Sequence, residues 1–339
     1  MTSESRFWMR SVSFLGLRNL VHAIATYPDG LTAKEIDEII RNKKIFRVGQ
    51  DRVPSKTTMY HHRNILRHLN IILERDRKIT INILDPKVAD LLDTFSKSEQ
   101  PVLTSEESER FANLVIRQPD CRAFFFDLFL KKGSDCYDLK TWLLEASPVI
   151  WREITHEKDH DERGNSHTDA TKRQISLINL TQSRELVLTT QNQIKAILYG
   201  VRYWARDELH FVDELFREDV GNVMFPVFFE ELIDLNDIIY LILNETKPDQ
   251  EWTRFNLRDL ALELCIKHRT PLRMFYDAVK ELHRRHPGHM ALIPTSSDFA
   301  SLSSNPKRER FELKHYLVDE RGRYISHVRL HSDLISLAI

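Results

Sequence analysis

Apolar side chains in the first 84 residues recur at two spacings, one typical of helices and one typical of strands. Helical spacing extends over residues 5–26, with a broad apolar face formed by Phe7, Val12, Leu15, Val21 and Ile24. Residues 27–30, Tyr-Pro-Asp-Gly, then predict a turn, because proline fixes φ and glycine accepts positive φ. Thr32 and Glu35 form a capping box that opens a second helix, and its buried stripe is Ile36, Ile39 and Ile40.

A third helix is predicted from Ser55 to Leu69. Its apolar face carries Met59, His62, Leu66 and Leu69, and its opposite face carries Thr57, Tyr60, His61, Asn64 and Arg67. Asn70 suits the left-handed conformation that often ends a helix. Residues 71–73 and 79–83 predict two strands joined by the charged turn 74–78, and the second strand shows the alternation of a half-buried sheet.

The middle of the chain predicts further helices. Ser105 begins one, with Phe111, Leu114 and Val115 on its inner face. Residues 183–218 predict one long helix or two helices joined near Gly200, and residues 223–243 predict another. Residues 156–171 are highly polar and predict a surface loop.

The C-terminal end predicts two helices followed by a hairpin. The first helix spans residues 256–269, and its inward positions are Leu257, Leu260, Leu264 and Cys265. Thr270 is the expected N-cap of the second helix, with Pro271 in its first turn. The buried face of that helix is expected at Leu272, Phe275, Val279 and Leu282. Residues 311–318 and 324–330 predict two strands joined by the turn 319–322.

These elements predict a mainly α-helical fold in three domains, at residues 1–95, 96–250 and 251–339. Composition agrees with this interpretation. Only nine of 339 residues are glycine, which disfavours dinucleotide-binding sheets and phosphate-binding loops. Apolar residues make up 42% and charged residues 29%, which excludes global disorder.

The composition also predicts a cellular compartment. Cys121, Cys136 and Cys265 cannot build a disulfide framework and indicate a reducing environment. Neither a signal peptide nor a membrane-spanning apolar run is expected from the sequence. We therefore expect a cytoplasmic protein with no membrane partner, with nucleoid association as an alternative, or a nuclear protein if the source is a eukaryote.

The net charge of −1 conceals a segregated pattern. Residues 1–84 carry 15 Lys and Arg against 8 Asp and Glu, whereas residues 85–251 carry 19 against 32. Residues 252–339 carry 15 against 10. A basic head, an acidic middle and a basic tail indicate separate roles for the three parts, although compositional drift also produces such differences.

The N-terminal order of three helices, a strand, a charged turn and a strand resembles the winged helix–turn–helix superfamily. The resemblance covers residues 7–84. It rests on Leu-Thr-Ala-Lys-Glu-Ile at 31–36, Ser-Lys-Thr-Thr-Met-Tyr at 55–60 and Leu-Arg-His-Leu-Asn-Ile-Ile at 66–72. In that family the third helix enters the major groove of DNA and the wing contacts the backbone or the minor groove.

The resemblance implies a set of DNA-contacting residues. The implied base readers are Thr57, Thr58, Tyr60, His61 and Asn64. The implied phosphate contacts are Lys56, Arg63, Arg67, Arg75, Arg77 and Lys78. The loop between the second and third helices is longer than the family's usual three or four residues, and it adds Arg47 and Arg52 as candidate phosphate contacts.

Charge supports the same interpretation without the resemblance. Residues 41–80 carry eleven Lys and Arg against three Asp and Glu. Cations that neutralise phosphates release counterions, which supplies most non-specific affinity for DNA. Asn, Thr, His and Arg on one helix face reach base edges or phosphates. A basic surface helix that binds protein is the alternative.

The C-terminal helices and hairpin predict a second DNA contact. A second winged helix is one interpretation of this region, and a helical domain capped by a hairpin is the other. The residues expected to contact DNA there are Arg273, Lys280, Arg284, Arg285, Arg321 and Arg323.

A zinc-protease motif is matched literally by His156-Glu157-Lys158-Asp159-His160. Gly164 and Asn165 follow closely and oppose a continuing helix, and His167 is the nearest further histidine. Among the fifteen histidines of this chain such a match carries little weight, and a solvated loop is the expected structure. Asp207, Glu208, Asp213 and Glu214 are expected in salt bridges rather than at a metal.

The sequence therefore predicts a non-catalytic protein that binds double-stranded DNA and has no cofactor and no metal. It acts either as the DNA-contacting subunit of a multi-protein complex or as a transcriptional regulator, with other subunits or further copies of itself as partners. A scaffold whose winged helices bind proteins is the alternative. A metal-dependent hydrolase depends on residues 156–160 alone.

Overall fold

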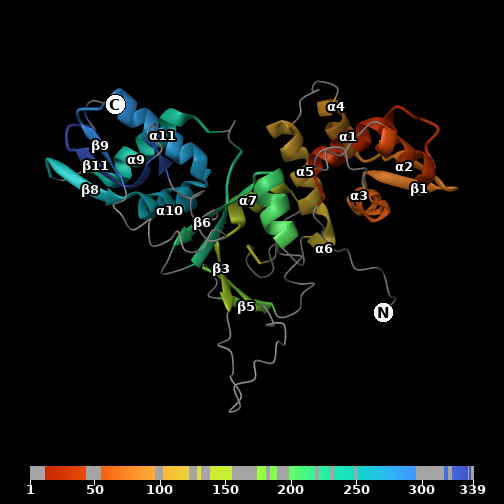
Figure 1. Cartoon of the computed structure of the whole chain (residues 1–339), viewed down its shortest axis with the longest axis horizontal. Coiled ribbons are helices and arrows are strands. Elements are labelled where there is room, and N and C mark those ends of the chain that lie inside the picture. Colours follow the sequence, from red (N-terminus) through yellow and green to blue (C-terminus); the bar gives the residue numbers. More distant parts are fainter. Residues whose placement is uncertain are drawn as a thin grey trace, which may run out of the picture. The chain divides into compact units, whose positions relative to one another are not determined.

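The structure is a computed structural model of the whole chain (Figure 1). It describes residues 12–42, 55–95, 102–121, 128–130, 138–154, 174–180, 184–188, 198–217, 221–229, 233–247, 250–294, 317–319, 323–334 and 336. The chain divides into two compact units. The first contains Met1–Ser147 and Glu153–Phe211, and the second contains Pro148–Arg152 and Val212–Ile339.

Three helices and a hairpin open the first unit, and we call them the N-terminal module. They are α1 (Phe14–Ala25), α2 (Ala33–Asn42), α3 (Lys56–His68), β1 (Ile72–Arg75) and β2 (Lys78–Ile81). The helix starts follow from local chemistry. The Thr32 backbone N–H donates to Glu35 Oε2 at 2.7 Å, and the Ser55 hydroxyl accepts from the Thr58 N–H at 3.1 Å.

The turns of the N-terminal module also form as the residue types predict. Asn70 ends α3 at φ 58°. Asp76 and Arg77 both have positive φ, which two-residue hairpin turns require. Leu31 forms an antiparallel bridge with Ile79, so β2 lies between β1 and the segment that precedes α2. The buried positions of α3 include Met59, His62 and Leu66, as the sequence predicts.

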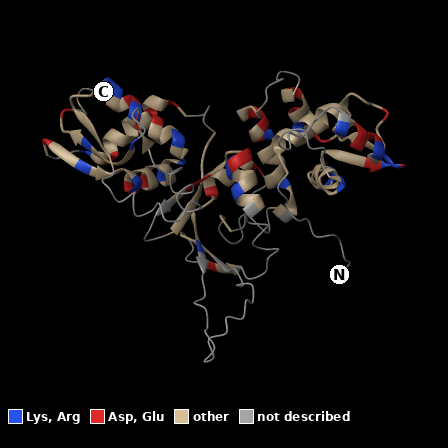
Figure 2. Cartoon of the chain, viewed as in Figure 1, with Lys and Arg blue, Asp and Glu red and all other residues tan. Residues whose placement is uncertain are grey.

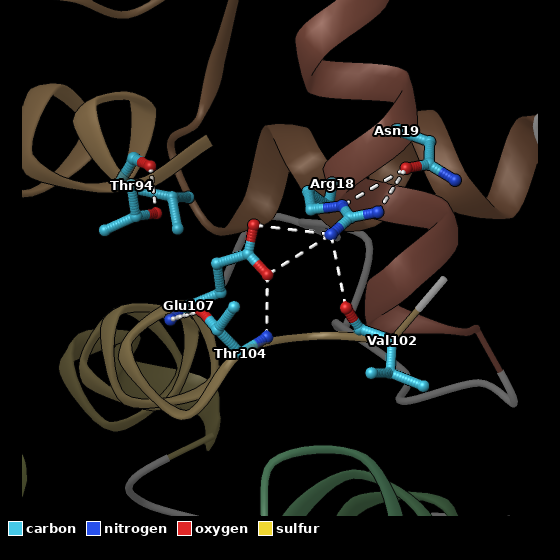
Figure 3. A network of polar contacts seen from close by, with 7 residues as sticks. Arg18, Asn19, Thr94, Val102, Thr104 and Glu107 are labelled. Atoms are coloured by element: carbon cyan, nitrogen blue, oxygen red, sulfur yellow. Dashed lines mark hydrogen bonds and ion pairs between the residues drawn. The ribbon is translucent and has the colours of Figure 1, made fainter. Parts of the chain in front are cut away.

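The rest of the first unit adds helices and an internal ion pair. The helices are α4 (Pro86–Phe95), α5 (Ser105–Arg117), α6 (Pro119–Cys121), α7 (Leu139–Glu145) and η2 (Leu198–Glu208), which has the wider π turn. Figure 3 shows Arg18 of α1 meeting Glu107 of α5 at 3.3 Å. Glu107 is fully buried and also accepts from the Thr104 N–H, while Arg18 donates to the Val102 carbonyl. This network fastens α1 to α5.

The expectation of a mainly α-helical fold is wrong, because the structure contains sheets of two, four and five strands. The five-stranded sheet lies in the middle of the chain, with the order β5-β4-β3-β7-β6. Its strands are β3 (Val149–Ile154), β4 (Gln174–Asn179), β5 (Arg184–Leu188), β6 (Val212–Arg217) and β7 (Gly221–Pro226). Val149 pairs with Met224 and Trp151 pairs with Asn222.

The helices predicted at 183–218 and 223–243 are therefore wrong in their main part. Residues 212–217 and 221–226 form an antiparallel hairpin, and the next helix begins at Leu235. Gly221 has φ 104°, and a Cβ added at this position would lie 3.1 Å from the Trp151 carbonyl oxygen. Glycine therefore allows the start of β7 to approach β3 closely. Charged residues spaced three or four apart suggested a helix surface, but Glu214 is buried within the sheet.

The second unit ends in the C-terminal module, which runs from α9 to β11. Its elements are α9 (Leu235–Thr246), β8 (Trp252–Asn256), α10 (Leu257–His268), α11 (Leu272–Arg285), β9 (Met290–Pro294), β10 (Leu317–Val318) and β11 (Tyr324–His331). β11 pairs with β8, β9 and β10 and is the centre of a four-stranded antiparallel sheet. The inward faces predicted for α10 and α11 are buried.

Two features of the C-terminal module differ from the sequence expectation. The strands β8 and β9, which flank the helix pair, were not predicted. Pro271, rather than Thr270, occupies the N-cap of α11, and no side chain of its own segment caps the helix. Asp213 of β6 supplies the cap, because its Oδ2 accepts from the Leu272 N–H at 2.7 Å.

The N-terminal and C-terminal modules share one order of elements. Helix α1 corresponds to α9, the Leu31 bridge to β8, α2 to α10, α3 to α11, β1 to β9 and β2 to β11. In each module the last strand of this series is the central one. The expected three-domain division remains a prediction. Within the part of the chain that the structure describes, no helix combines the length and apolar character needed to cross a membrane.

Candidate nucleic-acid interface

The outer face of α3 carries the side chains that the sequence proposed as base readers. Lys56, Thr57 and Tyr60 are exposed, and Tyr60 retains 52% of its accessible surface. The Tyr60 and His61 rings lie 5.8 Å apart and form one polar and aromatic surface. Thr58 is less available, because its hydroxyl is 2.9 Å from the Ser55 hydroxyl at the helix cap. Asn64 lies half-buried.

The β1–β2 hairpin adds cations beside this helix. Arg75, Arg77 and Lys78 are exposed around the tight turn. Arg67, in the last turn of α3, pairs with Glu74 of β1, so the exposed helix face and the hairpin adjoin. We call Lys56, Thr57, Tyr60, His61, Asn64, Arg67, Arg75, Arg77 and Lys78 together the α3–hairpin surface.

Ion pairing separates the cations of this surface into two groups. Among the described residues, Lys56, Arg75, Arg77 and Lys78 have no acidic side chain within ion-pair distance. Arg67 shares its charge with Glu74 at the surface, where such pairs contribute little stability. The first group therefore places uncompensated positive charge on the helix and the hairpin, and Figure 2 shows Lys and Arg in blue along this part of the chain.

Arg63 has a different role from the one expected for it. Its guanidinium pairs with Asp37 of α2, and only 13% of its side chain is exposed. Burial lowers the pKa of the Arg63 guanidinium, with a further contribution from the nearby Arg67 charge. Arg63 thus holds α2 against α3 and lies outside the α3–hairpin surface. Arg47 and Arg52 fall outside the described residues.

The C-terminal module presents cations that are mostly paired. Arg273 lies 3.9 Å from Asp277, and Arg323 pairs with Asp319 at 2.8 Å. Glu281 accepts from both Arg284 and Arg285, and these hydrogen bonds lower the pKa of Glu281 to about 2. Lys280 is exposed and, within the described ranges, has no ion pair. Arg321 falls outside the described residues.

Three of the four carboxylates considered as a metal site have separate contacts, and the fourth, Glu214, is buried in β6. Asp207 pairs with Arg206 at 2.8 Å, and Glu208 accepts from the Phe14 N–H at 2.9 Å. Asp213 caps α11 as described above. The match at residues 156–160 falls outside the described residues.

One cluster of ligand-type side chains was not predicted from the sequence. His289, His331 and Asp333 place three donor atoms within 4.8 Å of one another. Forty-two positions separate the two histidines along the chain, so no local spacing could have indicated the cluster.

Comparison with known proteins adds no further constraint: no protein-family model, no curated protein and no solved structure matches this chain.

Proposed function

We propose that the N-terminal module is a winged helix that binds double-stranded DNA through the α3–hairpin surface. The chain has no catalytic role in this proposal. It works as the DNA-contacting subunit of a multi-protein complex or as a transcriptional regulator. The observation that carries the proposal is the position of Lys56, Arg75 and Arg77, exposed and without an ion pair among the described residues, around a polar and aromatic helix face.

Each part of this surface has a chemical use on DNA. Unpaired cations neutralise phosphates and release counterions. Thr57, His61 and Asn64 offer hydrogen-bond donors and acceptors of the kind that reach base edges in the major groove. Because α3 is fixed by its buried side chains and by the Arg63–Asp37 pair, the exposed groups are held on a preformed face.

We propose the C-terminal module as an auxiliary contact. Its element order matches that of the N-terminal module, but its arginines on α11 are compensated by Asp277 and Glu281. This compensation favours a protein partner at α11, which keeps the scaffold as the second candidate function. Lys280, which has no ion pair within the described ranges, remains the residue through which this module would contact a phosphate backbone.

The test is fluorescence anisotropy of the full chain with a labelled duplex, measured between about 50 and 200 mM salt. Arg75→Ala, Arg77→Ala and Lys56→Ala should each weaken binding about three-fold at the low-salt end. Each should also reduce the slope of log affinity against log salt by about 0.9, because one phosphate contact is lost.

Lys34→Ala is the matched control. Lys34 is 88% exposed on α2, lies 3.9 Å from Glu38 and is not part of the α3–hairpin surface, so its loss should leave the salt slope unchanged. The proposal is contradicted, and the scaffold favoured, if all four variants show the same slope of log affinity against log salt. The same conclusion follows if the folded wild-type chain does not bind the duplex at the lowest salt.

A further inference from the structure

The C-terminal module brings two imidazoles together through strand pairing. Met290 of β9 pairs with Leu330 of β11, so His289 and His331 are the next cross-strand neighbours. The His331 N–H donates to the His289 carbonyl at 2.9 Å, which extends the ladder to this pair. Side chains at such positions project to the same face of a sheet. The rings accordingly lie 5.4 Å apart between centroids.

Asp333 supplies a third donor from the turn that follows β11. Its Oδ2 lies 3.6 Å from His331 Nδ1. Two ligand atoms bound at about 2.0–2.1 Å in a tetrahedral site lie roughly 3.3 Å apart, so this separation is close to what one ion needs. The Asp333 N–H donates to His331 Nδ1 at 3.1 Å, so a metal ion that binds this nitrogen replaces that hydrogen bond.

The surroundings of His331 fix its ring in this orientation. The Trp252 ring contacts it edge-on at 5.1 Å, and the Arg329 guanidinium lies 5.3 Å from the Trp252 centroid. On the opposite side of the imidazole, Nε2 lies 4.0 Å from Glu251 Oε1. At this distance Glu251 places a negative charge near the imidazole but makes no hydrogen bond to it.

We propose that His289, His331 and Asp333 bind one divalent transition-metal ion of the zinc class. Imidazole nitrogens favour Zn²⁺, Co²⁺, Ni²⁺ and Cu²⁺ over Mg²⁺ and Ca²⁺, which prefer oxygen ligands. His331 binds through Nδ1, the ring nitrogen that lies 3.6 Å from Asp333 Oδ2. The ion joins the start of β9 to the end of β11, at the end of this strand pair opposite the long connection between them. Three protein ligands leave one position for water.

Titration calorimetry of the full, tag-free chain with Zn²⁺ tests the stoichiometry and the ligands. We expect a site that Asp333→Asn and His289→Ala each weaken about 10-fold or more. Asp333 is 68% exposed, so its substitution leaves the fold intact and separates ligand loss from unfolding. His22→Ala, at an exposed position of α1, is the matched control and should leave the affinity unchanged.

A second pair of measurements separates this site from the other histidines of the chain. The double variant His156→Ala/His160→Ala should retain the site that Asp333→Asn removes. With Cu²⁺ as the probe, electron paramagnetic resonance should show nitrogen coupling from two imidazoles, reduced to one in His289→Ala. Unchanged binding in Asp333→Asn and His289→Ala, or loss of all binding in the 156/160 double variant, would overturn the proposal.

Discussion

The N-terminal and C-terminal modules have the same order of helices and strands but use their charges differently. Cations around α3 are exposed, and four of them have no ion pair among the described residues, whereas the arginines of α11 face Asp277 and Glu281. Both modules are rich in Lys and Arg by sequence. The comparison shows that a positive charge balance does not define a phosphate-binding surface, because local pairing decides how much charge is available.

The largest difference we expect lies in the energetics of two ion pairs. Arg18–Glu107 is buried, so Glu107→Gln leaves a desolvated arginine and should lower the free energy of unfolding by about 3–5 kcal/mol. Asp277→Asn breaks the exposed pair with Arg273 and should cost less than about 0.5 kcal/mol. Urea unfolding of the full chain measures both.

The double variant Arg18→Met/Glu107→Leu sharpens this test. It removes both buried charges and should recover much of the lost stability, because apolar replacements avoid the desolvation cost. If Glu107→Gln is as mild as Asp277→Asn, the network in Figure 3 does not fasten α1 to α5.

The next effect is a pH dependence specific to the N-terminal module. Burial lowers the pKa of His62 to about 4, although its Nδ1 donates to the Thr58 carbonyl at 2.7 Å. The unfolded chain binds a proton near pH 6.5, so the folded state loses stability as the pH falls from about 6.5 to 4, by about 3 kcal/mol in all.

His62→Gln should flatten that part of the stability profile, measured by urea unfolding at successive pH values. His61→Gln, on the exposed side of the same helix, is the control and should preserve the slope. A wild-type profile that does not change between pH 6.5 and 4 would contradict a buried neutral His62.

Two glycines provide a smaller contrast between the modules. Gly30 has φ 76°, and a Cβ there would lie 2.8 Å from Thr80 Cγ2, so Gly30→Ala should cost about 1–3 kcal/mol. Gly288, in the turn before β9, has open space at its Cβ position, so Gly288→Ala should change stability by about 0.5 kcal/mol or less. Thermal unfolding compares the two variants; equal costs would mean that the contact between residue 30 and Thr80 relaxes freely.

The smallest expected effect tests whether ion pairing prevents the arginines of α11 from binding DNA. Glu281→Gln removes the negative charge shared by Arg284 and Arg285 and should raise duplex affinity about two- to three-fold at low salt, because the two arginines are then less compensated and can neutralise phosphate. Glu38→Gln, which frees Lys34 on α2, should have no such effect. An unchanged duplex affinity in Glu281→Gln would indicate that α11 binds a protein partner rather than DNA.

The N-terminal module was predictable because its signals are local. The Thr32–Glu35 box, the Ser55 cap and the left-handed Asn70 each lie within a few residues of the structure they determine. The alternation at Ile79 and Ile81 likewise predicts a strand without distant information. Short-range chemistry and tertiary structure agree in this region.

The central sheet was not predictable from such signals. Charges at positions 207, 208, 213 and 214 fit helical spacing, yet the last two belong to β6, whose partner β7 supplies the missing hydrogen bonds. β8 and β9 are five residues long and are defined by β11, far along the chain. Their short sequences carry no alternation strong enough to compete with helix signals.

The sequence predicted where the candidate interface lies, but not which side chains form ion pairs or hydrogen bonds with distant residues. The sequence identified the exposed residues of α3 and the hairpin, because helix periodicity separates an apolar face from a polar one. It could not show that Arg63 meets Asp37, 26 residues earlier, or that Asp213 caps α11, 59 residues later. Such partners are set by packing between elements.

The pairing of β3 with β7 also has a consequence for synthesis on the ribosome. Val149, Ile150 and Trp151 find their partners at Asn222, Val223 and Met224, so about 70 residues must be translated after β3 before β7 exists. At about 5–20 residues per second this leaves an apolar strand edge without that partner for roughly 4–15 s. Nascent chains in this interval are the species most exposed to aggregation and to chaperone binding, and slower translation would lengthen the interval.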